Sequence, residues 1–189
     1  MSTSFETCGN AIVLVYEDAR PLLATDPWLT GTCYFGSWGL ELPLSDEQMS
    51  AVENAEYIWI SHGHPDHLHA DSLELLPRDK KILLPDSYHK GIESWLTDLG
   101  FKVETLKYRA WKRLSENVEI CCIDNINQDA ILVIRTSDGL VINQNDSPFF
   151  GELPFLRSIV RQFPREHTYL AALCAIDADM KNIVDRDGP

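Results

Sequence analysis

The stretch His62-Gly63-His64-Pro65-Asp66-His67 places three of the chain's six histidines and one aspartate within six residues. It follows directly on the apolar run Tyr57–Ile60, which predicts a short strand that ends at this motif. Neutral imidazoles suit zinc, iron and similar metals, and a carboxylate compensates the charge of the ion. The first two histidines lie two residues apart, so an extended backbone points both to the same side. The proline then turns the aspartate and the last histidine in another direction, towards a second ion. The motif therefore predicts a metal site at the end of a strand.

The rest of the chain predicts an α/β architecture. Residues 55–106 alternate between strand-like and helix-like segments, which indicates parallel strands joined by helical crossovers. No linker, repeat or low-complexity tract interrupts the sequence, so we expect residues 1–189 to form a single domain of two sheets with helices outside. The other expected elements are a hairpin at 11–25, strands at 118–123, 130–135 and 140–143, a helix at 152–163 and a strand at 169–176.

Composition excludes several classes of partner. The chain has 29 acidic and 16 basic residues and a formal net charge of −13, and a surface of this sign repels phosphate backbones and anionic lipids. No apolar run approaches the roughly 20 residues that span a bilayer. We therefore expect a small-molecule substrate and neither nucleic acid nor a membrane as partner. The five cysteines form no CxxC pair and the N-terminus resembles no secretory signal, so we expect reduced thiols and a cytoplasmic protein.

The motif resembles the HxHxDH signature of the metallo-β-lactamase superfamily. The resemblance extends to Asn10-Ala11, to Thr25–Leu29 (TDPWL) and to Ile142–Ser147 (INQNDS), which is similar to a later strand-end aspartate motif. The stretch Thr30–Trp38 (TGTCYFGSW) is similar to the branch that holds CMP-N-acetylneuraminate hydroxylase and its bacterial relatives, with the ascorbate-6-phosphate lactonases as a wider sister group. The resemblance implies an αββα sandwich, and the sequence leaves open whether the domain is C-terminally shortened, a fragment or half of an assembly.

The resemblance also implies a ligand set for two divalent metal ions. His62 and His64 would bind the first ion, and Asp66 and His67 the second. Asp146 would bridge the two ions. Asp66 would in addition orient the attacking hydroxide, as a catalytic residue. Zinc is the expected metal, with iron or manganese as alternatives. Besides these ligands, the resemblance implies that Asp26 of the TDPWL stretch is a buried structural carboxylate that forms hydrogen bonds near the motif.

Two further histidines of the superfamily have no matching position in this chain. The first would lie near residues 123–127, where Asp124 is the substitute ligand we expect, and a carboxylate there would shift the site towards iron or manganese. For the second, the sequence offers His167, which we expect at the surface, or Asp177 and Asp179 beyond the last strand. The remaining histidines, His69 and His89, are expected to be exposed.

Three functions are compatible with this sequence. The first is a metal-dependent hydrolase in which a metal-bound hydroxide attacks an ester, lactone or phosphoester. The second is an iron-dependent oxidative enzyme or oxygenase partner, whose electrons would come from a separate protein because no Rieske motif occurs here. The third is a non-catalytic module that kept the fold and lost part of the site. A partner protein or a homo-oligomer could complete the missing ligands.

Overall fold

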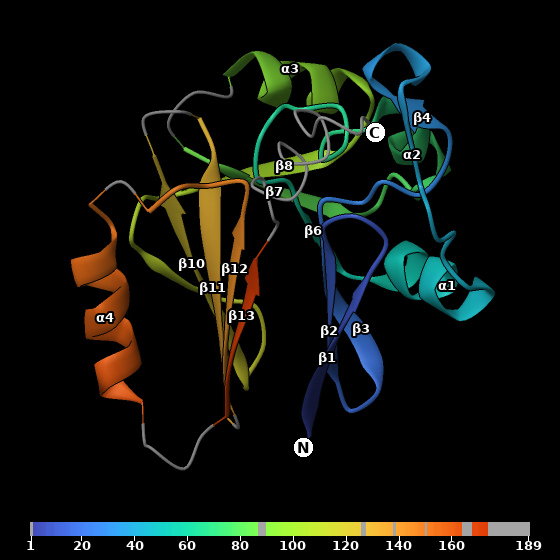
Figure 1. Ribbon diagram of the computed structural model, residues 1–189. Coiled ribbons are helices and arrows are strands. Elements are labelled where there is room, and N and C mark those ends of the chain that lie inside the picture. The colour runs from blue at the N-terminus through green and yellow to red at the C-terminus, as the bar shows by residue number, and fades with distance from the viewer. Residues whose placement is uncertain are drawn as a thin grey trace, which may run out of the picture.

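Two β-sheets pack face to face, and helices cover both outer faces (Figure 1). The computed structural model describes residues 2–86, 90–125, 128–137, 139–149, 151–163 and 168–173. The first sheet has the order β1-β2-β3-β6-β7-β8. Its strands are β1 (Thr3–Cys8), β2 (Ile12–Glu17), β3 (Arg20–Thr25), β6 (Tyr57–Trp59), β7 (Lys81–Pro85) and β8 (Lys102–Leu106).

The second sheet has the order β13-β12-β11-β10-β9. Its strands are β9 (Trp111–Arg113), β10 (Val118–Asp124), β11 (Ala130–Thr136), β12 (Gly139–Asn145) and β13 (Thr168–Leu173). A small two-stranded ribbon, β4 (Thr32–Cys33) and β5 (Trp38–Gly39), encloses a single turn of 3-10 helix, η1 (Tyr34–Gly36). The helices are α1 (Asp46–Asn54), α2 (Ala70–Leu75), α3 (Lys90–Asp98) and α4 (Leu153–Gln162).

The first sheet combines a hairpin with parallel crossovers. β1, β2 and β3 pair antiparallel, whereas β3, β6, β7 and β8 are parallel neighbours, as the alternation of segments over 55–106 predicts. Parallel strands need crossover connections, and helices supply them here. α1 begins at a capping box, in which Ser45 accepts from the backbone N–H of Gln48 and donates its own backbone N–H to the Gln48 side chain.

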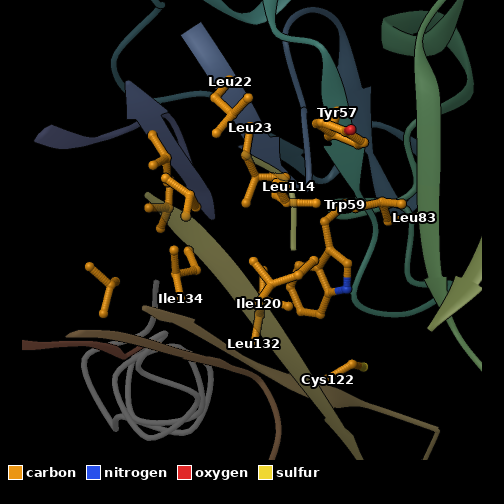
Figure 2. Packing of buried hydrophobic residues seen from close by; sticks show 14 of the residues in the cluster. Leu22, Leu23, Tyr57, Trp59, Leu83, Leu114, Ile120, Cys122, Leu132 and Ile134 are labelled. Carbon is orange, nitrogen blue, oxygen red and sulfur yellow. The ribbon is translucent and has the colours of Figure 1, made fainter. Parts of the chain in front are cut away.

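The core between the sheets is built from the inward faces of both sheets. Trp59 of β6 is fully buried and lies among Leu83 of its own sheet and Ile120 and Leu132 of the other (Figure 2). Burying a large aromatic side chain contributes about 2–3 kcal/mol relative to exposure. Trp59 is also the last residue of its strand, so the packing of its indole fixes where the following motif begins.

Two outer cores attach the helices. One lies between the first sheet and α1, α2 and α3, and includes Val52, Leu73 and Leu96 from those helices. The other lies between the second sheet and α4, whose Leu156 and Ile159 pack on Cys121 and neighbouring residues. The two helix layers lie on opposite sides of the molecule (Figure 1). The αββα arrangement expected from the sequence is confirmed.

Some boundaries differ from the expected ones. The edge strands β1 and β9 were not expected, because Thr3–Cys8 is largely polar and Trp111–Arg113 is short. The expected strand 169–176 is described only as far as Leu173, and residues 174–176 lie outside the described part. Within the described residues, no helix is long and apolar enough to cross a membrane.

Candidate metal centre

The candidate site lies on one rim of the sandwich, where strands of both sheets end. β3 and β6 are parallel neighbours, so the residues that follow them emerge at the same edge. β12 of the second sheet also ends at this rim, because Asn145 contacts Asp26, which follows β3. Loops at the end of a rigid sheet are common places for functional residues. The rim brings together segments that are more than 100 residues apart in sequence.

Asp26 anchors the rim from inside. Its side chain is fully buried, and its two oxygens accept hydrogen bonds from different segments. Oδ1 accepts from the backbone N–H of Ser61 at 2.7 Å, and Oδ2 accepts from Nδ2 of Asn145 at 2.9 Å. The backbone of Asp26 has a φ of 41°, a left-handed conformation that aspartate tolerates better than most residues. Asp26 thus ties the motif to both sheets, as the resemblance implies.

The rings of His62 and His67 are oriented by contacts on their Nδ1 sides. Nδ1 of His62 lies 2.9 Å from Oγ of Ser61, and Nδ1 of His67 lies 3.4 Å from Oδ2 of Asp26. Both imidazoles are buried, with 3% and 0% of their surface exposed. Holding Nδ1 leaves Nε2 of each ring directed elsewhere. Metal-binding histidines are usually held in this way, through the nitrogen that does not bind the ion.

The Nε2 atoms of these two histidines converge on Asp146. Oδ2 of Asp146 lies 3.8 Å from Nε2 of His62 and 3.5 Å from Nε2 of His67. Ligand atoms of the three residues all lie within 4.8 Å of one another. Nδ1 of His64 lies 2.8 Å from Nε2 of His62. The structure therefore brings Asp146 to the motif although 79 residues separate it from His67.

Asp66 lies at the edge of this group and is held by two further side chains. Its Oδ1 accepts from the hydroxyl of Tyr34 at 2.7 Å, and its Oδ2 accepts from Nδ2 of Asn10 at 3.2 Å. The same Oδ2 lies 3.3 Å from Nε2 of His67. Asp66 thus faces His67 on one side and the loop that carries Tyr34 on the other.

The pKa values of the two buried histidines, His62 and His67, are shifted in opposite directions. Burial lowers the pKa of His62 to about 4, and the neighbouring His67 adds to this effect. Burial also disfavours charge on His67, but contacts with Asp146, Asp26 and Asp66 outweigh it and raise the pKa to about 12. The carboxylates therefore favour a positive charge at this position. For Asp66, contacts with His67 and Tyr34 outweigh the effect of burial and hold the pKa far below its usual range.

The residues present fit a bound metal ion. Nε2 of His67 is buried and has no hydrogen-bond partner, although the carboxylates of Asp66 and Asp146 are close to it. A buried polar atom without a partner costs free energy, so such an atom in a native structure calls for an explanation. Imidazole nitrogens beside carboxylate oxygens are a donor set that zinc, iron and manganese accept. A divalent cation between these groups would satisfy the nitrogen and offset the carboxylate charge.

Sequence reasoning missed one nearby carboxylate and misjudged one histidine. Oδ1 of Asp129 lies 3.9 Å from Nε2 of His62, and no motif indicated this residue. Asp124 is buried at the end of β10, and it does not belong to the group of His62, His67 and Asp146. His69 is buried rather than exposed, because its side chain caps α2. The expectations for His89, His167, Asp177 and Asp179 lie outside the described residues.

A cavity of about 470 Å³ lies next to Asn10, and none of His62, His64, Asp66, His67 and Asp146 lines it. Asn10, which contacts Asp66, also lines this cavity, together with Trp28 and Trp38. The ring of Trp38 lies edge-on to that of Tyr34, at 4.7 Å between centroids. From the sequence, Trp28, Phe35 and Trp38 could either line a pocket mouth or pack in the core or a lid. Trp28 is buried and also lines the cavity, as does Trp38, whereas Phe35 is fully exposed and is not among the residues that line it.

Solved structures with a similar fold include hydrolases. An isothiocyanate hydrolase from Delia radicum gut bacteria covers 80% of this chain, with 64% of its own chain covered, 16% identity and a TM-score of 0.56. A proposed metal-dependent hydrolase from Veillonella parvula covers 86% of this chain, with 82% of its own covered, 14% identity and a TM-score of 0.59. The chain thus has the α/β fold of the metallo-β-lactamase type.

Proteins with similar sequences are considerably longer than this chain. A cytidine monophosphate-N-acetylneuraminic acid hydroxylase from Asterias rubens is 38% identical over 144 residues, which are 70% of this chain and 22% of that protein. A protein provisionally named a Rieske 2Fe-2S iron-sulfur protein, from Mycobacterium tuberculosis, is 27% identical over 154 residues, 74% of this chain and 29% of that protein. The chain spans less than a third of these curated relatives. No family model matches it.

Proposed function

We propose that the chain is a metal-dependent hydrolase domain that acts on an ester, lactone or phosphoester. The observation that carries the proposal is the convergence of His62, His67 and Asp146, whose ligand atoms lie within 4.8 Å of one another at a buried rim. The metallo-hydrolase fold supports it. The substrate would be a small molecule, and the cavity of about 470 Å³ beside Asn10, which contacts Asp66, is of a size that such ligands fill.

Two divalent ions would use the ligands that the motif suggests. His62 and His64 would hold one ion, Asp66 and His67 the other, and Asp146 would lie between them. Zinc is the first expectation, and iron or manganese are the alternatives. When bound, such ions polarise a substrate oxygen and lower the pKa of a water molecule towards neutrality.

The chain's own residues would perform the remaining tasks. Asp26 and Ser61 hold the imidazoles of His67 and His62 with Nε2 turned to the cluster. The low pKa of Asp66 keeps its carboxylate ionised at neutral pH, so it can accept a hydrogen bond from a water molecule and orient it. Tyr34 limits the rotation of that carboxylate through its hydrogen bond to Oδ1.

The test is turnover of chromogenic esters, lactones and phosphodiesters by the metal-loaded protein, the chelator-treated protein and the variant Asp66→Asn. We expect activity only with metal, and a fall of about a hundredfold or more in kcat for Asp66→Asn, the range typical of a lost acid–base group. The exposed Asp98→Asn is the matched control and should keep full activity. Metal content is measured for each sample. If the metal-loaded wild type turned over none of the three substrate classes, the result would contradict the proposal and favour a non-catalytic module.

A second candidate is oxidative chemistry with iron, and the sequence relatives favour it. Two of them carry the names of a hydroxylase and a Rieske protein, and both are more than three times as long as the matched region. In this case the chain would act with a partner protein or a second copy that delivers electrons. Iron retained through purification, with a visible absorbance band that reductant bleaches, would support this candidate. Colourless protein with zinc and hydrolytic turnover would contradict it.

A further inference from the structure

Asp129 is an acidic residue at the candidate site that the sequence pattern does not single out. Its carboxylate Oδ1 lies 3.9 Å from Nε2 of His62. The same nitrogen lies 3.8 Å from Oδ2 of Asp146 and 2.8 Å from Nδ1 of His64. Nε2 of His62 therefore lies within 3.9 Å of three further potential ligand groups, which come from its own segment and from two others.

The backbone around Asp129 is fixed by the hairpin of β10 and β11. The backbone N–H of Asn125 donates to the carbonyl of Asp129 at 3.0 Å, and the next residue, Ala130, pairs with Asp124 in the ladder. Asp129 is 9% exposed, so it is not a solvated loop residue. The hairpin thus holds the carboxylate at the rim, beside the ring of His62.

The local charge calls for a cation. Within the described part of the chain, the salt bridges of lysine and arginine go to carboxylates other than Asp26, Asp66 and Asp129. These three carboxylates are buried, at 0%, 3% and 9% exposure. Asp26 and Asp66 each lie within 3.4 Å of His67, whose imidazole can carry a positive charge, whereas Asp129 lies beside His62. A buried carboxylate without a compensating charge is strongly unfavourable.

We propose that Asp129 is a metal ligand, in the role that the sequence pattern suggested for Asp124. The proposal rests on the metal site of the proposed function, and it changes the chemistry of that site. With Asp129 the ligand set contains three aspartates beside three histidines. Compared with imidazole nitrogens, carboxylate oxygens favour the binding of manganese and iron over zinc. The chain's Asp129 therefore raises the affinity for Mn²⁺ relative to Zn²⁺.

The test is metal titration of the chelator-treated full chain with Mn²⁺ and, separately, with Zn²⁺, by calorimetry and by metal content after dialysis. We expect Asp129→Asn to weaken the binding of one ion about tenfold or more. Asp124→Asn, the matched control on the same hairpin, should leave both the affinity and the number of ions unchanged. Asp129→His should restore zinc binding while it lowers the ratio of Mn²⁺ to Zn²⁺ affinity about tenfold. Circular dichroism spectra of all variants check that the fold is kept.

Specific outcomes would overturn the inference. Asp129→Asn with wild-type affinity and stoichiometry for both metals would show that Asp129 is not a ligand. A loss of metal in Asp124→Asn, with Asp129→Asn unchanged, would assign the role to Asp124. A wild type that binds neither metal would remove this inference together with the proposed site. Metal binding that depends on Asp129, in a protein without hydrolytic turnover, would refute only the proposed reaction.

Discussion

Replacement of Asp26 tests the link between the fold and the candidate site. Asp26 lies outside the group of converging ligands, yet its two oxygens hold the backbone of Ser61 and the side chain of Asn145, and Oδ2 also faces His67. Asp26→Ala removes all three contacts. Asp26→Asn keeps an oxygen for Ser61 but turns an amide N–H₂ towards the N–H₂ of Asn145.

The magnitude follows from the groups left without acceptors. Each buried donor that loses its acceptor costs about 1–3 kcal/mol. Loss of the acceptors for the Ser61 backbone N–H and the Asn145 amide in Asp26→Ala therefore costs about 2–6 kcal/mol. The φ of 41° adds about 1 kcal/mol for alanine, which visits this region less readily than aspartate or asparagine. We expect the free energy of unfolding to fall by about 4 kcal/mol in Asp26→Ala and by about 2 kcal/mol in Asp26→Asn.

The assay is urea unfolding in the presence of chelator, so that metal binding does not contribute to the free energy. Tryptophan fluorescence and circular dichroism report the transition for wild type, both Asp26 variants and Asp98→Asn. The exposed control should stay within about 0.5 kcal/mol of wild type. An Asp26→Ala variant within about 1 kcal/mol of wild type, with an unchanged denaturant dependence, would refute the reasoning. Should Asp26→Ala not fold, the Asp26→Asn value still tests the argument, since it must fall below the control.

Two further variants probe the surroundings of the site and the junction of the sheets. Tyr34→Phe removes the hydroxyl that holds Asp66, so metal affinity should fall about tenfold. Tyr108→Phe removes a similar phenol–carboxylate hydrogen bond elsewhere and should leave the affinity unchanged, and equal effects of the two would contradict the assignment. Hydrogen bonds from Asn117 and Ser115 lower the pKa of Glu17, so its contribution to stability is present above its ordinary pKa and disappears as the pH falls through the lowered value. The stability difference between wild type and Glu17→Gln should therefore shrink between pH 7 and pH 3, and a difference independent of pH would exclude this role.

The sequence predicted the parts of the fold that follow from local pattern. The apolar runs and their alternation predict most strands of both sheets, and Ser45 with Gln48 predicts the beginning of α1. The edge strand Thr3–Cys8 escapes prediction because half of its residues face solvent and it has no apolar run. Its strand character comes from pairing with β2, which is a tertiary contact.

The candidate site was predictable where residues form a motif. The cluster of residues 62–67 and the later stretch that contains Asp146 both carry recognisable patterns. Asp129 is a single aspartate in a hairpin, and only the packing of the two sheets brings it to His62. Tyr34 reaches Asp66 because its backbone adopts a left-handed conformation, with φ of 47°, and no rule of sequence places a tyrosine there. His69 was expected to be exposed, and the sequence carried no signal for its role as helix cap because histidine is not among the residues that N-caps prefer.

The metal content of the purified chain tests the central claim most directly. Wild type, the double variant His62→Ala/His64→Ala and the control His69→Ala, which removes a histidine outside the cluster, are loaded with Zn²⁺ or Mn²⁺, dialysed and analysed by mass spectrometry of the metals. The account predicts at least about one equivalent in wild type and in His69→Ala, and loss of most of it in the double variant. Wild type without retained metal, or a double variant that retains as much as wild type, would contradict the account.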